Sequence, residues 1–117
     1  MKQVDFELVK GDDRTLTFHV TNADGTDTNL SSAVIEWIAV RDLVDANAVS
    51  ITKTSVTPSQ ILIEVPAEGY FSIYLVPSDT STFDVGVYDH QATVTDSAGK
   101  VTTVFNGSMT LTNRLAA

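Results

Sequence analysis

The stretch that decides the fold is residues 83–90, FDVGVYDH, in which Asp84, Gly86 and Tyr88 stand two residues apart. Apolar residues alternate with polar ones from Tyr88 to Val94, and period-two alternation is typical of a half-buried β-strand. A glycine just before such a strand leaves room for a sharp corner. The tyrosine can then fold back and donate a hydrogen bond to the backbone of that corner. The pattern therefore predicts a tyrosine whose hydroxyl bonds to the backbone at the start of a strand.

A second feature fits the same architecture. The only tryptophan, Trp37, lies in AVIEWIAV, the third strand that the alternation predicts. Immunoglobulin-like sandwiches combine a tyrosine corner before strand F with a core tryptophan on strand C, and antibody domains have a half-cystine two residues after the tyrosine. His90 stands at that inward position here. We predict an all-β, immunoglobulin-like antiparallel β-sandwich with Greek-key topology, whose corner and core residues are Asp84, Gly86, Tyr88, Trp37 and His90.

Short alternating segments separated by turn residues fill the rest of the chain. The predicted strands cover residues 4–8, 15–20, 33–40, 48–55, 60–65, 70–76, 86–95 and 101–111, and residues 41–48 are predicted to form a loop. This makes about seven or eight strands with no long helical pattern, which is typical of a sandwich.

Two local features refine the prediction. Ser78 and Asp79 are placed to cap one short helical turn. Asn106 and Gly107 form a dipeptide that favours a two-residue hairpin turn. We expect a bulge or bend there instead, because an unbroken strand from Val101 to Leu111 matches the length of its hairpin partner.

Length and composition bound the class of protein. The chain has 117 residues, is 43% hydrophobic and 19% charged, and contains no cysteine. These values predict a single folded domain over residues 1–117, without disulfides or thiolate zinc sites. Charges are mixed among the apolar positions of the first ten residues, so we expect no signal peptide there, and no stretch is apolar enough for a membrane helix. We therefore expect folding in a reducing cytoplasm and no membrane partner.

Charge argues against nucleic-acid binding. The net charge is −8, and the seven basic residues are scattered along the chain. Proteins that bind nucleic acids neutralise phosphates with clustered Lys and Arg. We expect no nucleic-acid partner, and we take the acidity to serve solubility.

Candidate catalytic and metal-binding residues are few. His19 should face solvent and His90 the core from the opposite sheet, so the two should share neither a metal ion nor a proton relay. The sequence NADGTD departs from a calcium-binding EF-hand loop, and aspartates in turns usually bond to the backbone. No nucleophile motif such as G-x-S-x-G occurs. We predict a non-enzymatic protein without metal or cofactor.

Three stretches together resemble a known family. They read KGDDRTLTFHV, ADGTDTNLSSAVIEW and AEGYFSIYLVPSDTSTFDVGVYDHQATVTDSAGKVTTVFNGSMTLT, and they cover nearly the whole chain. This order resembles the short immunoglobulin-like modules of tailed-phage virions, including the amino-terminal domain of baseplate upper proteins. The family often has DLTG where this chain has NLSS at residues 29–32. The resemblance implies structural roles for Trp37, Gly86 and Tyr88 and brings no catalytic residues.

The resemblance implies a virion structural protein. In baseplate upper proteins the module precedes receptor-binder-anchoring parts, so a module alone is expected to be a capsid decoration, neck or tail accessory protein. It would be made in the bacterial cytoplasm and would dock on other virion proteins, and on further copies of itself, to form a homo-oligomer. We expect docking at the amino-terminal strand or at Val101–Leu111, because edge strands offer unpaired backbone. The alternative is a glycan-binding module in which Tyr70 and Tyr74 stack on a sugar.

Overall fold

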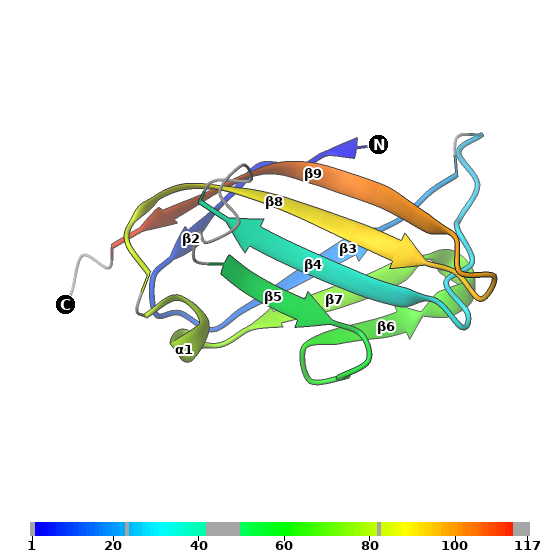
Figure 1. The fold of residues 1–117 in the computed structure, drawn as a ribbon, viewed down its shortest axis with the longest axis horizontal. Coiled ribbons are helices and arrows are strands. Elements are labelled where there is room, and N and C mark those ends of the chain that lie inside the picture. Colours follow the sequence, from blue (N-terminus) through cyan, green and yellow to red (C-terminus); the bar gives the residue numbers. More distant parts are fainter. Residues whose placement is uncertain (1, 23, 42–49, 82, 114–117) are drawn as a thin grey trace.

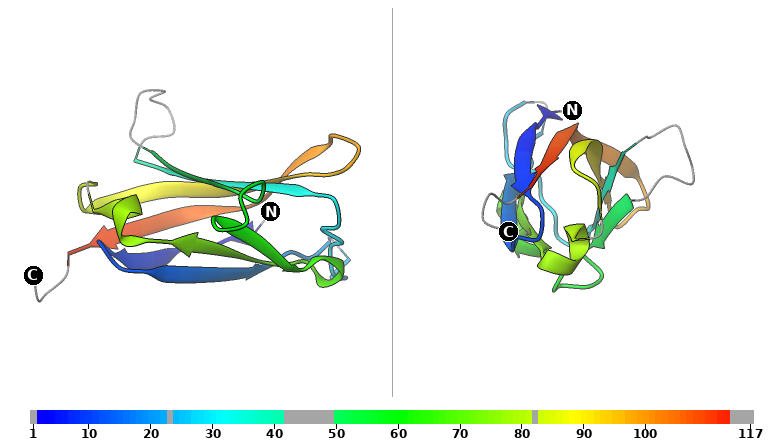
Figure 2. Two further views of the ribbon diagram at one scale, coloured as in Figure 1. Left: turned by 90° about the horizontal axis from the view of Figure 1, so that it is seen from below. Right: turned by 90° about the vertical axis from the view of Figure 1, so that its left-hand side faces the viewer.

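The computed structural model describes residues 2–22, 24–41, 50–81 and 83–113, and in it two β-sheets pack face to face (Figures 1 and 2). The strands are β1 (Lys2–Gln3), β2 (Phe6–Val9), β3 (Arg14–His19), β4 (Val34–Val40), β5 (Ser50–Thr54), β6 (Ile61–Val65), β7 (Tyr70–Leu75), β8 (Gly86–Thr95) and β9 (Val101–Thr112), with a 3-10 turn η1 (Pro66–Glu68) and a helical turn α1 (Pro77–Thr80). All eight predicted strand regions contain strands. The predicted loop lies, apart from Arg41, outside the described residues.

The pairing of the strands defines an immunoglobulin-like sandwich. The large sheet has the order β1-β9-β8-β4-β5, with β2 also paired to β9, and the small sheet has the order β3-β7-β6. The chain passes between the sheets after β2, β3, β5 and β7, so strands adjacent in sequence are often on different layers. The left view of Figure 2 shows the large sheet above the small one. The predicted all-β sandwich is confirmed.

One part of the prediction needs correction. The amino-terminal segment forms two short strands instead of one, and both run parallel to β9, whereas the other strand pairs of the described chain are antiparallel. The segment starts beside Phe105 and ends beside Thr112. Alternation reports which side chains face inward, but it carries no information about the direction of the partner strand.

The core lies between the two sheets, where the inward positions of the alternating segments meet. The buried apolar side chains of this core are Leu8, Leu16, Val20, Leu30, Ile35, Trp37, Ala39, Ile51, Ile61, Phe71, Ile73, Leu75, Tyr88, Ala92, Val94, Phe105, Met109 and Leu111. The inward positions of the strands are thus alternate residues, which is how two sheets fill the space between them.

The expected irregularity in the last strand lies at another residue. Asn106 and Gly107 sit in unbroken pairing with Gln91 and His90 of β8, so they form neither a hairpin nor a bulge. The register shifts between Thr103 and Phe105 instead, which leaves Val104 as the extra residue. The bend in β9 therefore comes from a β-bulge at an apolar residue that has no turn signature.

The lack of a side chain at Gly107 lets the amino-terminal chain pass close to β9. A Cβ added at this position would lie 1.9 Å from the Val4 carbonyl oxygen and 2.6 Å from its carbon, both backbone atoms. The Val4 N–H donates to the Asn106 carbonyl at 2.8 Å, so the two backbones are held at this separation. Only glycine fits at such a contact.

The short helical turn is capped differently from the prediction. Its N-cap is Val76, and Ser78 lies inside the turn. The Asp79 carboxylate accepts the Val76 N–H at 2.8 Å and also the Lys53 ammonium at 2.7 Å. Lys53 is 8% exposed, so this ion pair ties α1 to β5 in a partly desolvated place. Of the two predicted capping residues, Asp79 alone makes a capping contact.

We expect Gly107→Ala to lower the free energy of unfolding by about 1–3 kcal/mol, because the amino-terminal chain must move off β9 or β9 must deform. Thr110→Ala, on the outward face of the same strand, is the matched control and should cost less than about 1 kcal/mol. Urea denaturation of both variants measures the difference. Equal midpoints for the two variants would contradict the assigned close contact.

Candidate functional site

The tyrosine corner before β8 is present. The Tyr88 hydroxyl donates to the Asp84 carbonyl at 2.7 Å, and the tyrosine is buried at 2% exposure. Gly86 has a φ of 148°, a value that residues with a side chain rarely adopt. Asp84 contributes its backbone carbonyl, while its carboxylate is exposed and lies 3.8 Å from Arg41. The corner is therefore a structural device made of one side chain and backbone.

His90 links the core to the amino-terminal segment. The Trp37 indole N–H donates to His90 Nδ1 at 3.2 Å. An indole nitrogen can only donate, so Nδ1 is the acceptor and the imidazole proton is on Nε2. Nε2 lies 2.6 Å from the Val4 carbonyl oxygen and donates to it. This Trp37–His90–Val4 chain of hydrogen bonds satisfies a histidine that is 1% exposed.

The environment of His90 favours the neutral imidazole. Three aromatic rings, those of Phe6, Trp37 and Phe105, lie around it at centroid separations of 5.0, 6.1 and 5.8 Å. Burial lowers the pKa of His90 below its ordinary value of 6.5, against the opposing effects of the hydrogen bond to Val4 and of the carboxylates of Asp5 and Asp89. Protonation of Nδ1 would also set two donors, His90 and Trp37, against each other.

His19 and Tyr70 form a separate stack on the outer face of the small sheet. Their rings are 4.2 Å apart and nearly parallel, and His19 Nε2 lies 2.8 Å from an Asp27 carboxylate oxygen. As expected, His19 faces outward from β3 and His90 faces inward from β8, so the structure does not bring the two histidines together. One face of the Tyr70 ring is therefore covered by His19.

Tyr70 and Tyr74 share the outward face of β7, as predicted, and both are half-buried. Ser72 lies between them and is fully buried, although it is on the outer face. Its hydroxyl donates to Glu64 at 2.5 Å and lies 2.9 Å from the Thr17 hydroxyl. Between the two tyrosines, hydrogen bonds among Thr17, Ser72 and Glu64 therefore satisfy the polar groups of this face.

Aspartates in the turns bond to the backbone, as the sequence suggests. Asp24 accepts the N–H and hydroxyl of Thr26 at 3.0 and 2.6 Å, and these bonds lower the pKa of Asp24. Asp96 accepts the N–H groups of Ala98 and Lys100, both at 2.9 Å. In the described part of the chain, no group of three or more His, Cys, Asp or Glu side chains could hold a metal ion. None of the helices in the described ranges is long and apolar enough to cross a membrane.

The predicted docking edges are partly wrong. The amino-terminal segment does lie at an edge of the large sheet, but β9 is interior over Phe105–Thr112, where β1 and β2 pair with it. Only the first residues of β9, Val101–Val104, lie beyond the start of β1. Most of the predicted carboxy-terminal edge is therefore already covered by this chain's own amino-terminal segment.

The outer face of the large sheet carries little charge over its four long strands, while Glu7 of β2, which pairs with Thr110, adds a carboxylate at its edge. Among the described outward positions of β4, β5, β8 and β9, only Glu36 and Asp89 are charged, in a chain with 15 acidic and 7 basic residues. The remaining outward positions are Val34, Ile38, Val40, Thr52, Thr54, Val87, Gln91, Thr93, Thr95, Val101, Thr103, Asn106, Ser108, Thr110 and Thr112. We call this surface the neutral face.

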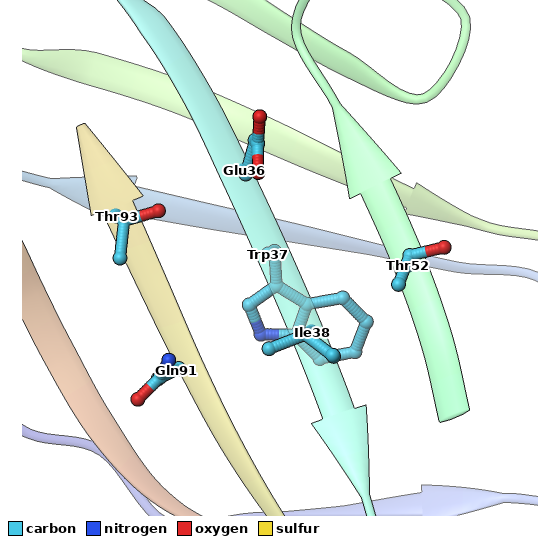
Figure 3. A pocket seen from close by; sticks show the side chains of 6 residues that line it. All are labelled: Glu36, Trp37, Ile38, Thr52, Gln91 and Thr93. Atoms are coloured by element: carbon cyan, nitrogen blue, oxygen red, sulfur yellow. The ribbon is translucent and has the colours of Figure 1, made fainter. Parts of the chain in front are cut away.

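A hollow of about 160 Å³ lies in the middle of the neutral face (Figure 3). Ile38 of β4 projects there between its cross-strand neighbours Gln91 of β8 and Thr52 of β5, and the exposed Glu36 and the half-buried Thr93 also line the hollow. Trp37 lies on the other side of the sheet, toward the core. Ile38, Gln91 and Thr52 carry no motif in the sequence, although alternation places Ile38 on the face opposite Trp37. The scarcity of charge becomes visible only when the outward residues of four strands are collected on one surface.

Comparison with known proteins adds little to this description. No protein-family model and no curated protein matches the chain. A solved structure of murine CRIg is similar over 97% of this chain and 93% of that chain, at 14% sequence identity and a TM-score of 0.41. We draw nothing from a similarity this weak, and the assignment of the fold rests on the strand pairing described above.

We expect Tyr88→Phe to lower the free energy of unfolding by about 1 kcal/mol or more, because the corner loses a hydrogen bond while the ring remains buried. Tyr74→Phe is the matched control, since its half-buried ring lies on the outer face. Urea denaturation of the two variants measures the effect. An unchanged midpoint for Tyr88→Phe would show that the bond to Asp84 does not stabilise the fold.

We expect the protein to lose stability as the pH falls through 6.5, because the unfolded state then binds a proton that folded His90 resists. The loss should continue until the pH reaches the lowered pKa of the folded state and should be constant below it. Comparing the free energy of unfolding at pH 7.5 and pH 5.5 tests this. His90→Gln should remove this part of the pH dependence, and His19→Gln should retain it; the reverse pattern would assign the effect to the exposed histidine.

Proposed function

We propose that the protein is a non-enzymatic structural module that docks on other proteins through its neutral face. The observation that carries the proposal is the near absence of charge on this face in a chain with a net charge of −8. The cores of protein interfaces are depleted in charged residues, because burying a charge without a partner is costly. A sheet surface rich in threonine can also supply hydrogen bonds around an apolar centre.

Ile38 is the proposed anchor of this docking. It stands beside the hollow between β8 and β5, where a partner side chain can insert and be surrounded. Val87 and Val101, at 59% and 63% exposure, are further apolar side chains on the face, and Asp89 lies between Val87 and the hollow. An interface with an apolar centre and a rim of Thr, Ser, Asn and Gln side chains has the usual anatomy of a specific protein contact.

We propose further that the partners are virion proteins of a tailed phage or prophage. This finer statement rests on the family resemblance of the sequence, with Trp37, Gly86 and Tyr88 at the matching positions. The acidic, cysteine-free composition suits a protein that folds in the bacterial cytoplasm before assembly. In a lattice, modest contacts at each copy add up through multivalency, so a small module needs no large interface.

A glycan-binding module is the second proposal, supported by the shared outward face of Tyr70 and Tyr74. Stacking on a sugar needs an open ring face, and His19 covers one face of Tyr70. We therefore place docking through the neutral face first. The two proposals use opposite sheets, so variants can separate them.

The direct test is to locate the protein. Phage particles are purified from a lysate of the source bacterium, analysed by mass spectrometry and labelled with gold-conjugated antibody for electron microscopy. Label over the head would indicate decoration, and label at one pole would indicate the neck, tail or baseplate. Absence of the protein from purified particles would contradict the virion proposal.

We expect Ile38→Glu to reduce incorporation into particles by about tenfold or more, equivalent to about 1.4 kcal/mol, because it replaces the apolar anchor by a second carboxylate beside Glu36, which the docked face would have to bury without a partner. Leu62→Glu makes the same change on the outer face of the small sheet, where Leu62 is 40% exposed, and should have little effect. Quantitative mass spectrometry of particles complemented with each variant measures the ratio. Loss of binding in Tyr70→Ala and Tyr74→Ala, but not in Ile38→Glu, would favour the glycan-binding module.

A further inference from the structure

One side of the sandwich has two strand edges without a neighbour among the described residues. In the small sheet, β3 pairs with β7 on one side and with no strand on the other. In the large sheet, β9 is covered by β1 only from Phe105 onward, so Val101–Val104 has no partner beyond β8. The amino-terminal segment therefore covers half of this side and leaves the other half open.

The backbone of β3 is oriented to accept another strand. The Val20 N–H donates toward β7, to the Gly69 carbonyl at 2.9 Å. Hydrogen-bonding directions alternate along an antiparallel strand, so Thr17 and His19 turn their N–H and C=O groups toward the open edge. An edge of this kind is a template for strand addition.

An open groove of about 1070 Å³ lies along these edges, between Thr17–Asn22, the stretch Thr102–Phe105 and the amino-terminal residues Gln3–Asp5. Its apolar lining is incompletely covered, because Phe18 and Val104 are only partly buried although both pack against the core. The Phe18 ring stacks on Phe105 at 4.4 Å, so the two sheets meet at the floor of the groove. The bulge at Val104 turns one further apolar side chain toward it.

We propose that this groove binds an extended, basic segment of a partner protein, which adds to β3 as a further strand. Its inward residues would be apolar and cover Phe18 and Val104, and alternate residues would be Lys or Arg. β3 has six residues, so it can pair with a segment about 20 Å long at the usual rise of about 3.3 Å per residue.

The carboxylates near the groove favour a positively charged partner. Asp5 lines the groove, and the Asp27 carboxylate lies 2.8 Å from Nε2 of His19, which lines it on the side of β3. Among the described residues that line the groove there is no Lys or Arg. The Asp5 carboxylate accepts the Ser108 N–H at 2.9 Å, a bond that lowers its pKa and keeps it ionised near neutral pH. A second copy of this chain, with its own charge of −8, is a poorer occupant than a basic segment.

This inference is independent of the docking proposed for the neutral face. The groove is formed by the facing edges of the two sheets, whereas the neutral face is the outward surface of the large sheet, and of the described residues Thr103 alone belongs to both. If the protein does not bind virions, it can still bind a basic strand in the groove. If the groove binds no such strand, the protein can still dock through the neutral face.

The probe is a ten-residue peptide of alternating valine and lysine with blocked ends, titrated into the ¹⁵N-labelled full chain and followed by NMR. A peptide of alternating serine and lysine matches its charge without the apolar residues. We expect saturable shifts of the amide signals of Thr15–His19 and Thr102–Val104 with the valine peptide, and at least about tenfold weaker binding of the serine peptide.

Variants at one exposed residue test the location. Thr102→Arg adds a cation in the groove and should weaken binding by about fivefold or more, and Thr102→Glu should strengthen it. Thr110→Arg and Thr110→Glu make the same charge changes on the neutral face of the same strand and should leave the affinity within about twofold.

Four results would overturn the proposal. They are equal effects of the Thr102 and Thr110 variants, equal binding of the two peptides, absence of groove shifts at millimolar peptide, and a homodimer in sedimentation that Thr102→Arg dissociates. The first two would mean general attraction of cations to an acidic protein. The last would mean that the groove is an interface between copies of this chain.

Discussion

The hydrogen-bond chain from Trp37 through His90 to the Val4 carbonyl is the interaction on which much of this structure depends. It joins β4, β8 and the amino-terminal segment inside the core, where antibody domains use a disulfide beside the same tryptophan. A histidine buried among three aromatic rings is costly unless both nitrogens are satisfied. Here a donor-only indole and an acceptor-only carbonyl satisfy both nitrogens, but only for the neutral imidazole with its proton on Nε2.

That arrangement fixes the path of the amino-terminal chain. Val4 must come within hydrogen-bonding distance of His90, and its backbone then crosses β9 at Gly107, the one residue there without a Cβ. β1 and β2 consequently pair with β9 and cannot also pair with β3. The covered edge of β9 and the open edge of β3 are thus two results of one constraint, and the groove lies where the segment does not reach.

The distribution of charge gives the second organising feature. Most of the carboxylates in the described ranges lie in turns, at strand ends or on the small sheet, and several bond to the backbone, as Asp24 and Asp96 do. Glu36 and Asp89 are the only charged residues among the described positions of the neutral face. A strongly acidic chain is soluble and resists self-association, so a surface spared from this charge is suited to contact with another protein.

Alternation along the chain was enough to predict the strands and the inward residues, because the period of two is a local property of extended backbone. The corner of Asp84, Gly86 and Tyr88 could be recognised for the same reason, since its hydrogen bond spans four residues. Other features depend on partners distant in sequence. The parallel pairing of the amino-terminal segment, the bulge at Val104 and the partners of His90 have no local signature in the sequence. The sequence by itself determined a β-sandwich with a tyrosine corner and a tryptophan core. Only the tertiary structure decided which edge stays open and which face is neutral, because both follow from the order in which whole strands lie side by side.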